Sequence, residues 1–251
     1  MAQAGARYPG SVSATPRGPV RAIFFDAGNT LLRMNYPVIA ATLASLGVFV
    51  SELSLQRAEW RARVRLDADL FASAAPRSST ESASTGERYL RYVLEGVGVT
   101  DEATLAAVAA WRRGYNPPVG IWNTAEPSAE AALTAVREAG VTAAVISNSN
   151  GSARSILESL GLARHLDFVL DSGEVGVEKP DPRIFRLALE RAAVAPSEAV
   201  YIGDLYSVDV LGARAVGLDA VLIDPGACWG ARDCVAAPDV LAAVRYALNG
   251  R

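Results

Sequence analysis

Short, almost wholly apolar runs alternate with amphipathic segments in the second half of the chain. The predicted strands are 141–146, 167–170, 199–202 and 219–223. The predicted helices are 128–139, 152–160, 182–192, 208–216 and 240–248. Strands that alternate with helices indicate a parallel sheet covered on both faces. The fold class expected from this pattern is therefore α/β.

The first half of the chain has a different pattern. One apolar strand, 21–25, is followed only by segments with helical periodicity. These predicted helices are 36–46, 51–72, 86–95 and 101–113, with Ser51 and Asp101 as N-caps and a Ser-rich loop at 76–85. An Asn-Pro-Pro sequence at 116–118 ends the helical block. We therefore expect a tail at 1–20, an α/β core at 21–34 and 116–251, and an inserted all-helical cap at 35–115.

Composition excludes several classes of protein. Apolar residues make up 51% of the chain and the net charge is −3, so nothing favours a nucleic-acid surface. No apolar run reaches the roughly 18 residues that span a bilayer. Residues 1–20 lack the apolar segment of a secretory signal and predict a disordered tail, so we expect a cytoplasmic location. Nothing in the sequence indicates an oligomeric state.

Side chains suited to zinc or to a Ser-His-Asp triad are scarce. The chain has two cysteines, Cys228 and Cys234, and a single histidine, His165. Two thiols do not make a disulfide framework, and zinc sites and the triad both need histidine or more cysteine. Lysine is scarcer still, since 23 of the 24 basic residues are Arg and the only lysine is Lys179. A lone lysine in such a chain either survives by chance at the surface or marks a position that needs a compact ammonium group, and the place of Lys179 in the sequence favours the second interpretation.

Three polar clusters directly follow predicted strands. They are Asp26–Thr30, Ser147–Asn150 and Asp204–Asp209. Ligands of parallel α/β sheets bind at the carboxyl ends of the strands, where such clusters come together. Each cluster also has an ordinary structural interpretation, because Asp, Asn, Ser and Thr are common in turns and helix caps.

Four segments in order carry a resemblance to a known family. They read FFDAGNTLL (24–32), AAVISNSN (143–150), GVEKPDPRIF (176–185) and VYIGDLYSVDVLGARAVG (200–217). Each segment alone is a weak signal. Together, in this order and in this structural context, they resemble the helical-cap branch of the haloacid dehalogenase-like (HAD) superfamily. The resemblance implies a Rossmann-like parallel sheet, a helical cap that closes over the site, and a hydrolase.

The resemblance also implies roles for these residues. Asp26 would be the covalent nucleophile, and Lys179 would neutralise charge on it and on a phosphoryl group. Thr30 and Ser147 would bind phosphoryl oxygens, and Asn148 would orient the nucleophile or the substrate. The ligands of a Mg²⁺ ion would be Asp26, Asp204 and the backbone carbonyl of Gly28. Asp209 would contact the ion through a water or lie behind its ligands, and it would also hold Lys179. The expected substrate is a small phosphorylated metabolite.

The chain departs from the family pattern at Gly28. Phosphatases of this family usually carry Asp there as general acid and base, which typically contributes about 10²–10⁴-fold to the rate. Its loss predicts slower turnover and a preference for leaving groups that need no proton. Another acid could come from Asp67 or Asp69 in the cap, or from water, although helix-surface carboxylates are usually solvated.

The sequence also allows other functions. A 2-haloacid dehalogenase also lacks that acid but uses no Mg²⁺, and the Gly203-Asp204 sequence argues against it. A phosphonatase needs a cap lysine, which this chain does not have. A binding protein that has lost turnover is the third alternative. The cap arginines Arg57, Arg61, Arg63 and Arg65 could hold an anionic substrate, but we expect them to form a solvated helix face. We expect core positions for Trp60 and Tyr89.

Overall fold

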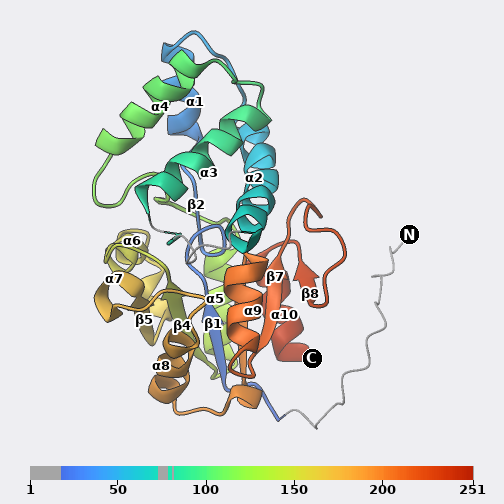
Figure 1. Ribbon diagram of the computed structural model, residues 1–251. Helices are drawn as coiled ribbons and strands as arrows, with labels where there is room; N and C mark the ends of the chain where they lie inside the picture. The colour runs from blue at the N-terminus through green and yellow to red at the C-terminus, as the bar shows by residue number, and fades with distance from the viewer. Residues whose placement is uncertain (1–17, 73–78, 81, 251) are drawn as a thin grey trace.

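The computed structural model describes residues 18–72, 79–80 and 82–250 (Figure 1). Of the predicted tail, residues 1–17 lie outside the described residues, as do 76–78 and 81 of the predicted loop. None of the described helices is long and apolar enough to cross a bilayer.

Six strands form one sheet in which every described pairing is parallel. In spatial order they are β5 (Phe168–Asp171), β4 (Thr142–Ser147), β1 (Ala22–Phe25), β6 (Ala199–Gly203), β7 (Asp219–Ile223) and β8 (Val235–Ala237). The first strand lies at the centre, and the chain continues to β4 on one side of it and to β6 on the other. Such a switch point leaves a crevice at the carboxyl ends of the strands.

The central strand β1 is buried on both faces. Ile23 and Phe25 pack into the core on one side of the sheet, and Phe24 packs into the core on the other. This alternation follows from the period of two in a strand. Burial of one such large apolar side chain contributes about 1.5–3 kcal/mol, so β1 is a rigid support for the residue that follows it.

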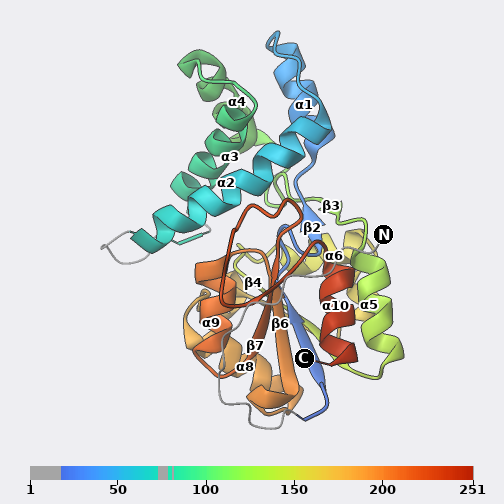
Figure 2. The ribbon, with the colours of Figure 1, turned by 90° about the vertical axis from the view of Figure 1, so that its right-hand side faces the viewer.

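Helices cover both faces of the sheet, as Figure 2 shows. One face packs against α5 (Ala129–Glu138), α6 (Ala153–Ser159) and α10 (Val240–Asn249). The other packs against α8 (Pro182–Ala192) and α9 (Leu211–Arg214). The shorter elements are α7 (Ser172–Val175), the 3₁₀ turns η1 (Ala163–His165) and η2 (Pro196–Glu198), and the π-helical turn η3 (Tyr206–Val210). The predicted α/β class with a parallel sheet is therefore confirmed.

Four further helices stand above the carboxyl edge of the sheet (Figure 1). They are α1 (Tyr36–Ser45), α2 (Glu52–Ala72), α3 (Ala83–Gly96) and α4 (Glu102–Gly114). They share an apolar core of their own, and α2 also contacts η3. The strand β2 (Leu32–Arg33) leads from the sheet into these helices, and β3 (Thr124–Ala125) leads from them back to the sheet. The two strands pair antiparallel. The two connections are thus hydrogen-bonded to each other.

Several predicted bounds differ from the structure. Helix α3 begins at Ala83 because Ser82 accepts a hydrogen bond from the Thr85 backbone, whereas we predicted a start at 86. The predicted helix 208–216 is instead the π-helical turn η3 followed by α9. The strands β2, β3 and β8 were not predicted, because runs of two or three residues carry too little periodicity to recognise.

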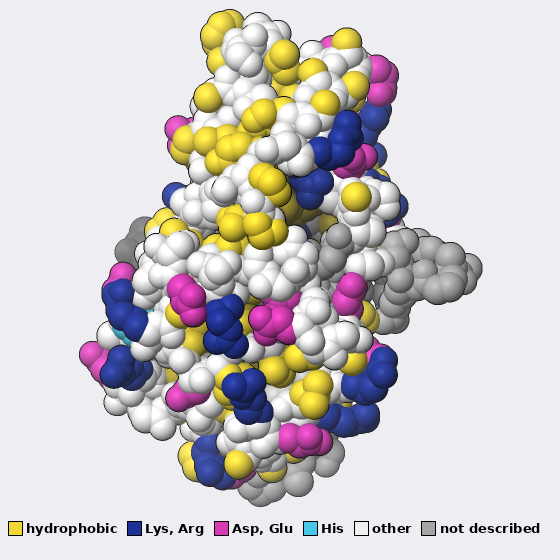
Figure 3. Space-filling model, turned by 90° about the vertical axis from the view of Figure 1, so that its left-hand side faces the viewer, with side chains coloured by type: hydrophobic (Ala, Val, Ile, Leu, Met, Phe, Trp, Pro, Cys, Tyr) yellow, Lys and Arg dark blue, Asp and Glu magenta, His cyan; other side chains and the backbone are white. Residues whose placement is uncertain are grey.

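The outer surface bears charges of both signs. On the face shown in Figure 3, Arg side chains are interspersed with Asp and Glu, and apolar side chains gather over the helical upper part.

Candidate active site

The carboxyl ends of three neighbouring strands open into one cavity of about 430 Å³. Asp26 directly follows β1, Asp204 directly follows β6, and Ser147 is the last residue of β4. These positions come together because the strands are parallel and adjacent in the sheet. The cavity is also lined by Gly28, Asn148, Lys179 and Asp209.

Lys179 is the centre of the polar network beneath the cavity. Its Nζ donates hydrogen bonds to Asp26 Oδ1 at 2.6 Å, to Asp209 Oδ1 at 2.8 Å and to the Tyr201 hydroxyl at 2.8 Å. Lys179 is 4% exposed, and its two carboxylate partners raise its pKa despite the burial. The only lysine of the chain is therefore held as a cation against the predicted nucleophile.

Asn148 positions this lysine from the backbone side. Its Oδ1 accepts from the Lys179 backbone N–H at 2.7 Å, and its Nδ2 donates to the Lys179 carbonyl at 2.9 Å. The amide of Asn148 thus pairs with the lysine loop and does not cap a helix.

Tyr201 on β6 was not identified from the sequence. It is fully buried, its hydroxyl accepts from Lys179, and it lies 3.0 Å from Asp209 Oδ1 and 3.2 Å from the Ile146 carbonyl. A buried tyrosine in an apolar strand needs a partner for its hydroxyl, and that need was the available signal.

Three buried carboxylates face one another without enough positive charge between them. Asp26, Asp204 and Asp209 each place one oxygen within 4.8 Å of the others. Burial raises the pKa of Asp26 to about 6, although Lys179 lowers it. Burial also raises the pKa of Asp204 well above its ordinary value, against the lowering effect of Arg63. Clustered carboxylates in a dry site gain stability from a cation.

A divalent cation with oxygen ligands fits this donor set. Mg²⁺ is bound by one or two carboxylates and keeps several waters. Asp26 and Asp204 meet that requirement, and Gly28 lies beside them in the cavity lining. Asp209 is already engaged through both oxygens, since Oδ2 accepts from the backbone N–H groups of Asp204 and Leu205. Asp209 is therefore placed behind the cation site, where it holds Lys179.

Thr30 is the one predicted site residue that the structure does not bring to the cavity. It is 1% exposed and lines a smaller neighbouring cavity beside Glu59 and Arg63. Its hydroxyl has no hydrogen-bond partner among the described residues. Asn29, one residue earlier, instead reaches the site and donates to Asp204 Oδ2 at 3.2 Å.

The expectation of a solvated helix face was wrong for Arg63 on α2. Arg63 is 3% exposed and donates to Glu59 through Nε at 2.8 Å and Nη2 at 2.5 Å. Its Nη1 makes no hydrogen bond to any described residue but lies 3.4 Å from Asp204 Oδ2. The hydroxyls of Tyr36 and Tyr89 also donate to Glu59. Burial of this arginine is possible because the paired carboxylate offsets its charge.

The two candidate acids in the helical part do not line the cavity. Asp67 is buried, contrary to expectation, and accepts from the backbone N–H and hydroxyl of Ser207 at 2.9 and 2.6 Å. Asp69 accepts a hydrogen bond from the Tyr92 hydroxyl. Asp67 therefore joins α2 to η3, and Asp69 joins α2 to α3. Arg57, Arg61 and Arg65 are exposed, as expected.

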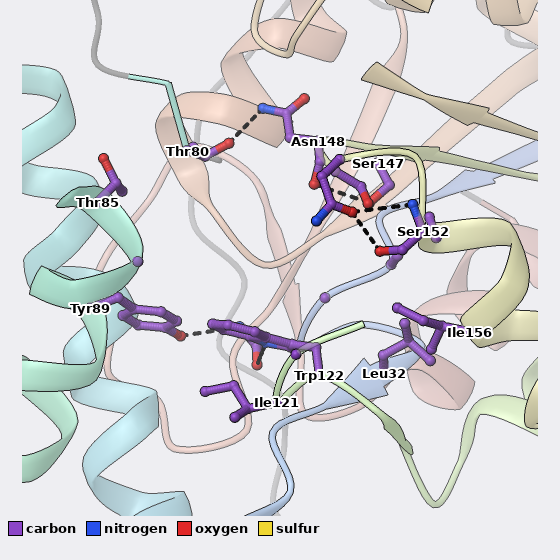
Figure 4. A pocket seen from close by; sticks show the side chains of 18 of the residues that line it. Leu32, Thr80, Thr85, Tyr89, Ile121, Trp122, Ser147, Asn148, Ser152 and Ile156 are labelled. Carbon is purple, nitrogen blue, oxygen red and sulfur yellow. Dashed lines mark hydrogen bonds between the residues drawn. The ribbon is translucent and has the colours of Figure 1, made fainter. Parts of the chain in front are cut away.

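The cavity is polar at one end and apolar at the other (Figure 4). Thr80, Ser147, Asn148 and Ser152 lie on one side of the view, and Leu32, Ile121, Trp122 and Ile156 lie on the other. Tyr89 was expected in the core, and it is buried, but it also lines this cavity and stacks on Trp122 with ring centres 5.8 Å apart. Trp122 had no sequence signal, because it stands in an irregular connection.

Comparison with known proteins agrees with this architecture. Residues 20–217 match the family model of haloacid dehalogenase-like hydrolases. A mouse relative, haloacid dehalogenase-like hydrolase domain-containing protein 3, is 33% identical over 81% of this chain and 82% of its own length. The phosphoserine phosphatase of Thermus thermophilus is 42% identical over 56% of this chain and 55% of its own length. An L-2-haloacid dehalogenase structure superposes with a TM-score of 0.61 at 19% identity, covering 93% of this chain and all of its own. The chain belongs to the haloacid dehalogenase-like hydrolase family.

Proposed function

We propose that the protein is a Mg²⁺-dependent phosphatase of a small phosphorylated metabolite, acting through a covalent phosphate on Asp26. The observation that carries the proposal is the position of Asp26 at the base of the cavity, between the Lys179 ammonium and the Asp204 carboxylate. A nucleophile held next to a fixed cation in a buried site is ready to attack a group that carries negative charge.

The remaining roles follow from the positions of the side chains. Ser147 would contact phosphoryl oxygens at the polar end of the cavity, and Asn148 would orient the site through its hydrogen bonds to the Lys179 backbone. Thr30 would act only after a movement of its loop. The ligands of the ion would be Asp26, Asp204 and the Gly28 carbonyl, with Asp209 behind it. When bound, Mg²⁺ would offset phosphoryl charge in the transition state.

The domain assignment belongs to the same proposal. Residues 21–34 and 116–251 would form the catalytic core, and 35–115 would be a cap that selects the substrate. The hydrogen-bonded pair β2–β3 would be the hinge, because both connections pass through it. We propose a small-molecule substrate, no nucleic-acid partner and a cytoplasmic location.

The test compares wild type with Asp26→Asn on p-nitrophenyl phosphate and acetyl phosphate, with Mg²⁺ and with EDTA. Wild type should turn over, lose activity in EDTA, and yield a phosphorylated peptide containing Asp26 by mass spectrometry. The matched control is Asp224→Asn, another aspartate that directly follows a strand but does not line the cavity. Equal negligible rates for wild type and Asp26→Asn would favour a non-catalytic binding protein.

C–halogen hydrolysis is the second candidate, because the dehalogenase above shares the fold and a carboxylate nucleophile could also attack carbon. Asp204 and its buried neighbours disfavour it, since the carboxylates of this cluster outnumber the cations beside them and a divalent ion would offset the excess negative charge. Halide release from 2-chloropropionate that persists in EDTA would select this candidate.

A further inference from the structure

The space beside the nucleophile at position 28 is bounded by Trp122. A Cβ atom added to Gly28 would lie 3.6 Å from Trp122 Cδ1, 3.7 Å from Trp122 Nε1 and 4.0 Å from Asp26 Oδ2. These are ordinary van der Waals separations, and φ of Gly28 is outside the left-handed region. The backbone therefore does not require glycine here. The indole of Trp122 would be the nearest neighbour of any side chain at this position.

Trp122 is held in this position from two sides. Its ring stacks on Tyr89 with an angle of 13° between the planes, and its Nε1 donates to Asn29 Oδ1 at 3.3 Å. The indole N–H is therefore committed to an amide oxygen. An indole N–H is in any case no acid, so Trp122 fills the space without supplying a proton.

The described lining of the cavity offers no carboxyl or imidazole group outside the charge cluster. Its Asp, Glu and His residues are Asp26, Asp204 and Asp209, and each has a place in the charge cluster. The Tyr89 hydroxyl donates to Glu59. A general acid must lie within hydrogen-bond reach of the oxygen that it protonates.

We infer that the site is built for phosphoryl donors whose leaving oxygen departs as a stable anion, namely aryl or acyl phosphates with an apolar carbon skeleton. This inference rests on the proposed phosphatase function and narrows its substrate class. The skeleton would pack on the apolar end of the cavity, against Trp122, Ile121 and Leu32. Phenolate and carboxylate ions delocalise the electron pair that they take, so they leave without a proton.

The step balances without an acid. The Asp26 carboxylate forms a bond to phosphorus, the bond from phosphorus to the leaving oxygen breaks, and that oxygen keeps the electron pair. Water then attacks the aspartyl phosphate, which releases inorganic phosphate, regenerates the Asp26 carboxylate and passes one proton to solvent. A general acid beside the leaving oxygen would also face the attacking water and could act as its base. The absence of such a group therefore slows hydrolysis of the aspartyl phosphate as well. The phosphorylated enzyme should accumulate.

The experiment measures kcat/KM for a series of substituted phenyl phosphates, for benzoyl phosphate and for 2-phenylethyl phosphate, all with Mg²⁺. For wild type, kcat/KM should fall steeply as the leaving group becomes more basic, and p-nitrophenyl phosphate should give a burst of p-nitrophenolate. If kcat/KM depended only weakly on the basicity of the leaving group, and 2-phenylethyl phosphate were hydrolysed at the same rate as p-nitrophenyl phosphate, the inference would be overturned. The phosphatase proposal would still stand. Absence of turnover for every phosphate ester and acyl phosphate would overturn both.

A pair of double variants tests the cause. Gly28→Asp with Trp122→Ala makes room for an acid, and Gly28→Asn with Trp122→Ala is its matched control of the same shape. General acid–base catalysis typically contributes about 10²–10⁴-fold, so the Asp variant should exceed the Asn variant by at least about tenfold on 2-phenylethyl phosphate. The two variants should differ little on benzoyl phosphate. Equal rates of the two on 2-phenylethyl phosphate would show that a missing acid does not set the preference.

Discussion

Two regions meet at the cavity, and they hold buried charge in different ways. At the sheet edge, Lys179 joins Asp26 and Asp209, which come from segments far apart in the sequence. In the helical part, Glu59 and Arg63 pair within one helix, one turn apart. The first arrangement leaves excess negative charge that a cation and a substrate can share. The second is closer to neutral, because each charge has its partner in the same helix.

The contact between the two regions is small but specific. Arg63 Nη1 lies 3.4 Å from Asp204 Oδ2, and Asn29 joins Asp204 to Tyr89 on α3. A carboxylate proposed to bind Mg²⁺ is thus also touched by the helical part. Removal of charge in the two regions should therefore have different consequences: mainly lost activity at the sheet edge and mainly lost stability in α2.

Lys179→Met should have the largest effect on activity. The substitution removes the only cation among the described residues that hydrogen-bonds to Asp26, and loss of one preorganised charge-stabilising donor costs on the order of 10²–10³-fold in rate. The measurement is kcat with p-nitrophenyl phosphate and Mg²⁺, together with circular dichroism to check folding. Arg186→Met, an exposed cation on α8, is the control and should keep wild-type activity. A folded Lys179→Met protein of wild-type rate would remove the lysine from the mechanism.

Arg63→Met should have the largest effect on stability. It leaves Glu59 buried without its ion-pair partner, and breaking a buried pair costs about 3–5 kcal/mol. Urea denaturation measures the loss. The double variant Glu59→Gln, Arg63→Met should recover part of it, because the side chain at position 59 is then neutral and needs no ion-pair partner. Additive losses in this double-mutant cycle would show that the pair is not coupled.

Tyr201→Phe should have an intermediate effect. It removes a hydroxyl that accepts from Lys179 and lies beside Asp209, and loss of one buried hydrogen-bond partner costs about 1–3 kcal/mol. We expect a lower free energy of unfolding and a fall of about tenfold in kcat, which corresponds to about 1.4 kcal/mol. Tyr246→Phe on α10, away from the cavity, is the matched control. Unchanged kcat would mean that the Asp26 and Asp209 contacts suffice to position Lys179.

The smallest effects should come from helix caps, one in each region. Ser51 accepts from the Ser54 backbone at the start of α2, and Asp239 accepts from the Ala242 backbone at the start of α10. Replacement of either by Ala should cost about 0.5–2 kcal/mol and leave kcat unchanged. Thermal unfolding and a steady-state assay measure both quantities. A drop in kcat for Ser51→Ala alone would indicate that the position of α2 limits turnover.

The sequence by itself determined the class of fold and the carboxyl edge of the sheet as the place of the site. Strand and helix periodicities are local, and parallel pairing brings the residues after β1, β4 and β6 to one edge whatever their distance in the chain. Asp26, Ser147 and Asp204 could be placed there because each ends a strand or directly follows one. The count of a single lysine singled out Lys179 without any structural information.

Only the tertiary structure decided which other side chains share that cavity. Arg63 and Arg65 stand on the same helix and look alike in sequence, yet Arg63 is buried against Glu59 and Asp204 while Arg65 is exposed. Trp122 bounds the space beside Gly28, although 94 positions separate them along the chain. Such contacts depend on how helices pack on a sheet, and packing joins residues whose spacing along the chain carries no period.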